Sequence, residues 1–195
     1  MCECCCTTEK DIYLPELATI TKMDLMNDTE MYLHVDLDSG KALGHKPGQF
    51  VEVSVAGIGE APISISSSPT QSGFDMVIRK IGNVSNAIHL MKAGDKLGIR
   101  GPFGSGYPLD ELKGNNLVFI CGGIGLVPQR SLINYVIDNP GDFGKMSVVL
   151  GTKDFDQRIY LEENYRGDAD TNMQLSTTID VSNDKWCGHA VGVTT

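Results

Sequence analysis

The chain has 195 residues and a formal net charge of −9, which is enough for one large domain or two small ones. The residue types AVILMFWYC make up 41% of it, and no apolar run approaches the ~20 residues that a membrane span needs. The acidic balance argues against a nucleic-acid partner, since such proteins normally carry a basic surface. We therefore expect a packed globular protein with no membrane span and no nucleic-acid partner.

The cysteines are unevenly distributed along the chain. Four of them crowd the N-terminus at Cys2, Cys4, Cys5 and Cys6. This pattern does not suit a disulfide framework and indicates a reducing compartment, so we expect the cytoplasm. Four thiolates satisfy the ligand count of a zinc or iron–sulfur site, although ligand pairs normally have about two residues between them. These cysteines are candidate metal ligands, and a Cys-rich tail over residues 1–10 is the alternative.

Residues 11–112 have the texture of a domain of short strands. Apolar and polar residues alternate with period 2, and turn signals such as Lys46-Pro47-Gly48 separate the alternating stretches. The expected strands are Leu17–Met23, Met31–Leu37, Phe50–Val55, Ile63–Ser66, Phe74–Ile81 and Asp95–Arg100. Short strands at this spacing predict a sandwich or a closed barrel, and closure would remove exposed strand edges. One helix is expected among them, capped by Ser85, filled by Ala87–Met91 and ended by Gly94.

Residues 113–195 have a different texture, which predicts an α/β domain. Leu117–Cys121 is wholly apolar, as in a strand buried on both faces. Pro128–Asp138 predicts a helix with Pro128 near its first position. Two further strands are expected at Met146–Gly151 and Met173–Ile179, with a helix at Gln157–Glu163 between them. This alternation predicts a parallel sheet with right-handed crossovers.

Three glycine- or serine-rich segments are candidate ligand sites. In Ala61–Pro69, Ile alternates with Ser, so that one face of a strand would carry hydroxyl groups able to hold a planar, polar-edged ring. An ordinary barrel strand followed by a serine-rich turn is the alternative, and this segment alone favours it.

The second segment, Arg79–Asn86, places two cations and a glycine turn before a helix N-terminus, which suits a phosphate. A capped surface helix is the alternative. The third segment, Gly122–Pro128, lies between a buried strand and a helix, where doubly wound sheets bind a dinucleotide pyrophosphate. Its spacing is not G-x-G-x-x-G, so this turn alone is a weak signal.

The order of these segments, with Gly101-Pro102-Phe103-Gly104 between the second and the third, resembles the ferredoxin–NADP reductase superfamily. Within it, the likeness is to the electron-transfer flavoprotein subunits of dihydroorotate dehydrogenase, anaerobic sulfite reductase and sulfhydrogenase complexes. The resemblance implies an antiparallel Greek-key FAD-binding β-barrel over residues 11–112. It also implies a partial, Rossmann-like, parallel-sheet NAD(P)-binding domain over residues 113–195.

The resemblance also implies roles for individual residues. Ser64 would contact the flavin ring near N5 and is the candidate catalytic residue, with Ile63 packed on the ring. The other implied flavin contacts are Pro62, Ile65 and Ser66 near the ring, Val77, Ile78 and Arg79 along the ribityl and phosphate region, and Gly82, Asn83, Val84 and Ser85 at the pyrophosphate. The implied NAD(P)H contacts are Gly122, Gly123, Gly125, Leu126 and Pro128.

The sequence departs from the family pattern in two places. Ala61 stands where the family has an arginine for the flavin phosphate, so Arg79 or backbone N–H groups must meet that charge, and we expect weak FAD affinity in the isolated chain. Family members also continue beyond the position of Thr195, with a Cys-Gly-Pro segment and, in several, cysteines for a [2Fe–2S] cluster. We therefore expect a fragment or a chain completed by a partner, which would supply any [2Fe–2S] cluster.

The resulting hypothesis is an FAD-containing oxidoreductase subunit that passes electrons between NAD(P)H and an iron–sulfur protein or the catalytic subunit of a redox complex. Two alternatives remain at this point. One is a flavin-binding assembly module without catalysis, and the other is a stand-alone NAD(P)H:flavin reductase.

Overall fold

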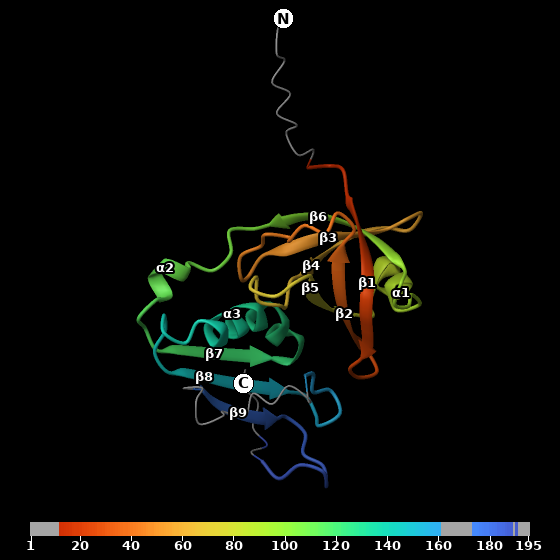
Figure 1. Cartoon of the computed structure of the whole chain (residues 1–195). Helices are drawn as coiled ribbons and strands as arrows, with labels where there is room; N and C mark the ends of the chain where they lie inside the picture. Colours follow the sequence, from red (N-terminus) through yellow and green to blue (C-terminus); the bar gives the residue numbers. More distant parts are fainter. Residues whose placement is uncertain (1–11, 161–172, 189, 191–195) are drawn as a thin grey trace, which may run out of the picture.

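The computed structural model describes residues 12–160, 173–188 and 190, and these residues form an antiparallel sheet followed by a parallel one (Figure 1). We call the part that carries the antiparallel sheet the first half of the molecule, and the part that carries the parallel sheet the second half. The succession of an antiparallel β region and an α/β region confirms the predicted fold class.

The antiparallel sheet of the first half has the strand order β4-β3-β6-β1-β2-β5. Its strands are β1 (Glu16–Leu25), β2 (Glu30–Leu37), β3 (Phe50–Val55), β4 (Gly59–Ser64), β5 (Phe74–Arg79) and β6 (Lys96–Phe103). Alternate residues of these strands meet in one core, so that Ile20, Leu33, Val53 and Phe74 are fully buried. The period-2 pattern in the sequence is thus the inward face of this sheet.

The antiparallel sheet is barrel-like but does not close, so the closed barrel that was one of the two expected forms is not what the structure shows. The edge strands β4 and β5 form no continuous ladder, and in the described part of the chain an isolated bridge between Ile65 and Met76 joins the two segments. The amide of Ser66 also donates to the carbonyl oxygen of Asp75 at 2.8 Å. Beyond this point, in the described part of the chain, the facing edges of β4 and β5 form no strand pairing with each other. Both edges of this unpaired seam line a cavity instead.

The short helix α1 (Asn83–Ile88) follows β5, and its start differs from the prediction. Gly82 is the N-cap, and Ser85, expected to be the cap, lies in the first turn. Ile88 anchors the helix in the first-half core. The helix also ends earlier than predicted, at Ile88 with His89 as its C-cap. Gly94, the predicted C-terminal glycine, has a φ of +97° and lies instead in the turn before β6.

The second half is built on a parallel sheet with the order β7-β8-β9. Its elements are α2 (Leu109–Leu112), β7 (Leu117–Gly122), the 3₁₀ turn η1 (Gly123–Gly125), α3 (Leu126–Asp138), β8 (Met146–Thr152) and β9 (Met173–Ile179). The three predicted strands and the helix before β8 are confirmed. The helix predicted over Gln157–Glu163 is not formed in its described part, which ends at Tyr160.

Strand β7 is not buried on both faces, contrary to the prediction from its apolar sequence. Val118 is 67% exposed and Ile120 is 60% exposed, while Leu117, Phe119 and Cys121 are buried. The reason is that α3 packs on the face of β7 that carries the buried set, while the face with Val118 and Ile120 stays exposed.

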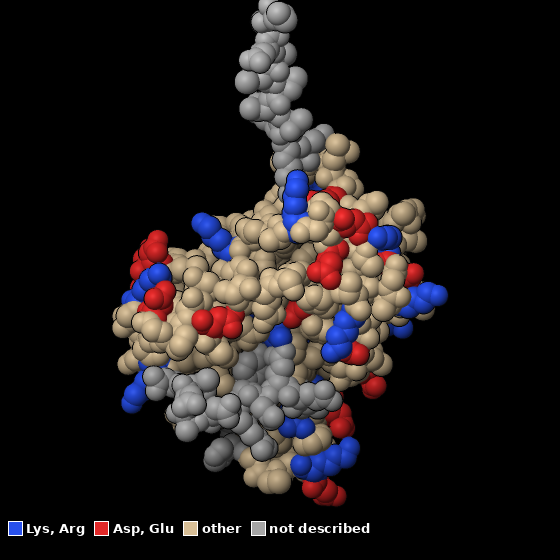
Figure 2. All heavy atoms as spheres, in the orientation of Figure 1, with Lys and Arg blue, Asp and Glu red and all other residues tan. Residues whose placement is uncertain are grey.

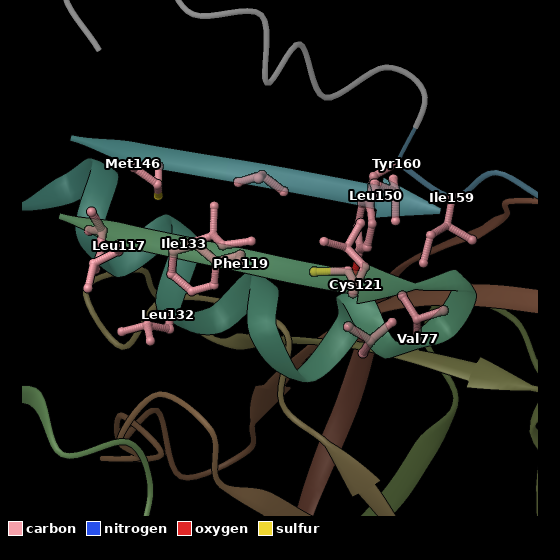
Figure 3. Close-up of a cluster of buried hydrophobic side chains, with 14 of the residues drawn as sticks. Val77, Leu117, Phe119, Cys121, Leu132, Ile133, Met146, Leu150, Ile159 and Tyr160 are labelled. Carbon is pink, nitrogen blue, oxygen red and sulfur yellow. The ribbon is translucent and has the colours of Figure 1, made fainter. Parts of the chain in front are cut away.

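Helix α3 lies between the two sheets (Figure 1). Its side chains Leu132 and Ile133 pack with Phe119 in the second-half core, and Val77 of β5 belongs to the same cluster (Figure 3). A strand of the first half therefore contributes to the core of the second, so the two halves share apolar contact as well as a chain connection.

The two faces around β7 should differ sharply in their tolerance of truncation. Ile133→Ala should lower the free energy of unfolding by about 2–5 kcal/mol, because it leaves a cavity in the core. Ile120→Ala, the matched control on the exposed face, should change it by less than about 0.5 kcal/mol. Urea denaturation followed by circular dichroism measures both values, and equal losses would contradict this assignment of the faces.

Candidate functional site

A cavity of about 730 Å³ opens along the unpaired seam of the first half and reaches the second half. Its walls come from four segments: β4 with the residues before it, the end of β5, the turn into α1, and the start of α3. Volumes of this order are typical of sites for cofactors and other small molecules. Chain segments distant in sequence thus meet around one candidate site.

The first wall is formed by the facing edges of β4 and β5. Pro62, Ile63 and Ser64 line the cavity from β4, and Val77, Ile78 and Arg79 line it from β5. Since the two edges do not pair with each other, backbone groups along the seam are available to a ligand. Proline suits this edge position because it has no N–H to donate to a neighbouring strand.

The turn from Ile81 to Ser85 is shaped by one hydroxyl group. Ser85 Oγ accepts hydrogen bonds from the amides of Ile81 and Gly82, at 3.0 and 2.8 Å, and donates to the carbonyl oxygen of Gly82 at 3.0 Å. His89 Nε2 donates to the carbonyl oxygen of Ile78 at 2.8 Å and pins the end of α1 to β5. The Ser85 hydroxyl proton is therefore committed to the turn, which leaves backbone N–H groups of the first helical turn to face a ligand.

The cation of this wall, Arg79, has a buried partner. Its Nε donates to Glu30 Oε1 at 2.6 Å, and its Nη2 forms an ion pair with the same oxygen. The Glu30 side chain is 2% exposed, whereas that of Arg79 is 44% exposed. The guanidinium is thus held from behind by a carboxylate and keeps an accessible side toward the cavity.

The second wall is the glycine turn and the start of α3. Ile124, Gly125, Val127 and Pro128 line the cavity, and a Cβ built at Gly125 would meet no atom within 4 Å. A side chain at this position would therefore occupy cavity space without clashing with the protein, and glycine leaves that space open. Helix α3 begins two residues earlier than predicted, so Pro128 is its third residue rather than its first. Proline is tolerated there because the amides of the first turn have no intrahelical acceptor.

The base of the glycine turn is fastened by Gln129. Its Nε2 donates to the carbonyl oxygen of Ile120 at 3.1 Å, and its Oε1 accepts from Cys121 Sγ at 3.2 Å. Burial raises the pKa of the Cys121 thiol to about 11, from a usual value of 9.0. Cys121 is thus a protonated packing residue at the end of β7 rather than a nucleophile.

Most of the residues implied by the family resemblance line this cavity. Those that do so are Pro62, Ile63, Ser64, Val77, Ile78, Arg79, Gly82, Asn83, Val84, Ser85, Gly125 and Pro128. Five do not: Ile65 lies in the first-half core, Leu126 lies in the second-half core, Ser66 binds α3, and Gly122 and Gly123 precede the lining residues of their turn.

Sequence reasoning missed part of the cavity lining. Ile58, Gly59 and Glu60 contribute from the start of β4, and Ile81 contributes from the turn before α1. The alternation used to place the strand began only at Ile63, so the sequence offered no period-2 signal for the earlier residues.

The described residues contain no group of three or more His, Cys, Asp or Glu side chains placed to hold a metal ion. The candidate ligands Cys2, Cys4, Cys5 and Cys6 lie outside those residues. No helix among the described residues is long and apolar enough to cross a membrane. On the face shown in Figure 2, acidic and basic side chains are interspersed.

Family models for two domains match the chain. Residues 17–107 match the oxidoreductase FAD-binding domain, and residues 119–195 match the oxidoreductase NAD-binding domain. The cavity lies between the regions covered by these two matches. The chain belongs to the oxidoreductases that combine these two domains.

Curated relatives agree with this family. The chain is 45% identical over 118 residues to the sulfhydrogenase 2 subunit gamma of Pyrococcus furiosus, covering 60% of this chain and 41% of that protein. It is 34% identical over 118 residues to a probable dihydroorotate dehydrogenase B (NAD(+)) electron transfer subunit of Methanocella arvoryzae, covering 60% and 42%. The chain thus spans less than half the length of these two relatives.

Solved structures share the fold of these oxidoreductases. The flavohaem-like FAD/NAD-binding domain of nitric oxide dioxygenase from Vibrio cholerae superposes with a TM-score of 0.78 at 14% identity, covering 93% of this chain and 81% of that one. Ferredoxin–NADP⁺ reductase from Plasmodium falciparum gives a TM-score of 0.73 at 18% identity, covering 88% and 72%. The arrangement of the two halves is therefore the ferredoxin–NADP reductase fold.

The raised pKa of Cys121 predicts a pH-dependent stability. Between about pH 9 and about pH 11 the unfolded chain loses the thiol proton while the folded chain keeps it, so this contribution to stability is present below about pH 9 and lost as the pH rises through about 11. Cys121→Ala should remove that component from the pH profile of the unfolding free energy, measured in urea. Cys187→Ala, at an exposed position, is the matched control. Parallel profiles for the wild type and Cys121→Ala would contradict the prediction.

Proposed function

We propose that the chain binds FAD in this cavity, accepts hydride from NAD(P)H, and passes electrons onward to an iron–sulfur protein or the catalytic subunit of a redox complex. The observation that carries the proposal is one cavity lined by both the FAD-binding and the NAD-binding region of the chain. A two-substrate site of this kind brings two planar rings together without an acid–base side chain.

The residues present fit a flavin. The unpaired edges of β4 and β5 offer backbone donors and acceptors to a ring with polar edges, and the aliphatic lining residues offer apolar contact. Ser64, half-buried at the end of β4, would hydrogen-bond the ring near N5, and Ile63 would pack on its face. When bound, flavin supplies the conversion from a two-electron hydride donor, which leaves as NAD(P)⁺, to one-electron acceptors.

The phosphates of FAD would lie at the other end of the first wall. Arg79 is the cation that the cavity offers among its described lining residues, and Glu30 offsets part of its charge. Backbone N–H groups at Gly82–Ser85 would supply the rest, in place of the arginine that Ala61 replaces. A single compensated cation supports weak binding of FAD to the chain by itself.

NAD(P)H would approach from the second wall. Gly125 leaves open space, and the apolar residues Ile124, Val127 and Pro128 would pack against the nicotinamide half of the ligand. This turn stands directly before α3, so its position follows that of the helix.

The partner is proposed by analogy with the relatives, both of which are named as subunits of larger enzymes. The cytoplasm remains our proposed location, on the cysteine pattern described above. Any [2Fe–2S] cluster would belong to a partner or to sequence beyond the residues described.

The proposed function is tested by reconstitution with FAD. The chain should acquire a flavin absorption spectrum that bleaches when NADH or NADPH is added without oxygen. Ser64→Ala should keep FAD bound and slow the bleaching about tenfold, because one hydrogen bond near the reacting atom is lost. Ser72→Ala, in an exposed turn, is the matched control.

Stopped-flow absorbance measures these rates. A chain that binds FAD without bleaching would support the assembly module instead, and turnover of free FMN or FAD as a substrate would support the stand-alone reductase. A chain that binds no FAD at saturating concentration would refute both the proposed function and the assembly module.

The charge balance at Arg79 predicts how FAD affinity responds to mutation. Glu30→Gln should tighten FAD binding about fivefold at low salt, on the order of 1 kcal/mol, because the guanidinium then acts on the phosphates uncompensated. Arg79→Met should weaken binding by a similar factor. Both effects should shrink at high salt. Fluorescence titration with FAD measures the affinities, and unchanged affinity in both variants would place the phosphates elsewhere.

A further inference from the structure

A buried ion pair joins the two halves directly behind the cavity. Arg130 of α3 and Asp75 of β5 are 5% and 3% exposed, and Arg130 Nη1 lies 3.1 Å from Asp75 Oδ2. The same Nη1 donates to the carbonyl oxygen of Ser66 at 2.9 Å. One guanidinium thus binds both segments that meet at the Ile65–Met76 bridge.

The carboxylate of Asp75 is held on its other side by the first half. Tyr32 Oη donates to Asp75 Oδ1 at 2.8 Å, and His34 Nδ1 donates to the same oxygen at 2.7 Å. Burial, followed by the Asp75 charge, raises the pKa of Tyr32, which keeps its proton in place as a donor. Both carboxylate oxygens therefore have fixed partners.

A second set of hydrogen bonds runs beside the ion pair. Ser131 Oγ donates to the carbonyl oxygen of Ser67 at 2.6 Å, and His45 Nε2 donates to the same carbonyl at 3.1 Å. Tyr160 Oη donates to Ser66 Oγ at 3.1 Å. The Arg130 guanidinium also lies over the Tyr160 ring, 4.3 Å from its centroid. We call Arg130, Ser131, Asp75, Ser66 and Ser67 the interhalf clamp.

Stability alone does not account for such a pair. Removing two charges from water costs about as much as their attraction returns, so a well-packed apolar pair often stabilises a fold equally well. Because hydrogen bonds are directional, a set of them gives what apolar contact cannot, which is a single orientation of one surface on another. The clamp is therefore better suited to fixing geometry than to adding stability.

The clamp residues lie close in sequence to residues that line both walls of the cavity. Ser64 of the first wall precedes Ser66 by two positions, and Pro128 of the second wall precedes Arg130 by two. A shift of α3 along the clamp would move Gly125 and Pro128 relative to the edge of β4.

We propose that the interhalf clamp sets the distance and angle between the flavin wall and the nicotinamide wall, with Arg130 as its central positioning residue. The inference rests on the proposed function for its effect on hydride transfer. Its structural part, that the clamp orients α3 on the first half, is independent of any cofactor.

The test is the double variant Arg130→Met/Asp75→Asn, which removes both charges together. The matched control is Lys96→Met/Asp38→Asn, since Lys96 Nζ and Asp38 Oδ2 form an ion pair at 2.7 Å within the first half. The clamp variant should keep its FAD affinity within about twofold, while flavin reduction at saturating NAD(P)H slows by about 10- to 100-fold. The control should change neither quantity.

Hydrogen exchange of the protein without cofactor supplies the second readout. In the clamp variant, amides of residues 66–70 and 126–134 should exchange faster, and those of β1 and β2 should not. Faster exchange throughout the chain would indicate loss of folding stability and would overturn a positioning role. Unchanged exchange in both interface segments would overturn the clamp itself.

The outcomes separate this inference from the proposed function. If the wild type with FAD is not reduced by NADH or NADPH, the proposed function fails, and the exchange experiment still decides the clamp. If reduction proceeds at the wild-type rate in the double variant, the positioning role is overturned. Should the double variant not fold, Ser131→Ala and Arg130→Lys weaken the clamp without burying a lone charge, and both should slow reduction without changing FAD affinity.

Discussion

The unpaired seam between β4 and β5 is the constraint on which the other features of the site depend. Backbone N–H and C=O groups at a sheet edge need partners, and barrels normally provide them by closing. Here the isolated Ile65–Met76 bridge joins the segments that carry the two edges, and the cavity takes the place of further pairing. The turn into α1 and the glycine turn before α3 stand at the margins of that opening, so a ligand in the seam meets both.

Charge around the cavity is compensated pair by pair. Glu30 is buried behind the half-exposed Arg79, whereas Asp75 and Arg130 are both buried. Because an exposed guanidinium keeps most of its hydration and a buried one does not, these two arginines serve different purposes. Arg79 can exchange water for an anionic ligand, while Arg130 can only hold the protein groups that already surround it.

Local patterns in the sequence predicted the strands well, because period-2 alternation reports which face of a strand is buried. They could not report what lies against that face. The apolar run of β7 does not reveal that Val118 and Ile120 face away from α3, and nothing local shows that the sheet stays open. Asp75 occupies a position in β5 where alternation predicts a solvent-facing polar residue, yet the second half buries it. The glycine and serine motifs contain most of the residues that line the cavity. Of the clamp they contain only Ser66 and Ser67, and no local pattern marked Asp75, Arg130 or Ser131.

In the proposed FAD site Ala61 supplies no cation, so phosphate recognition would depend mainly on the shape of the backbone. A backbone site binds only if its amides are already aimed, since disordered amides would lose entropy on binding. Two side chains provide that order from behind the turn: Ser85 closes it through its hydroxyl, and His89 ties the end of α1 to β5. In the proposed site these two side chains would contribute to phosphate binding by fixing the shape of the turn. Gln129 would have the corresponding role on the proposed nicotinamide side, because it orders the base of a turn whose cavity-lining residues are glycine and apolar side chains.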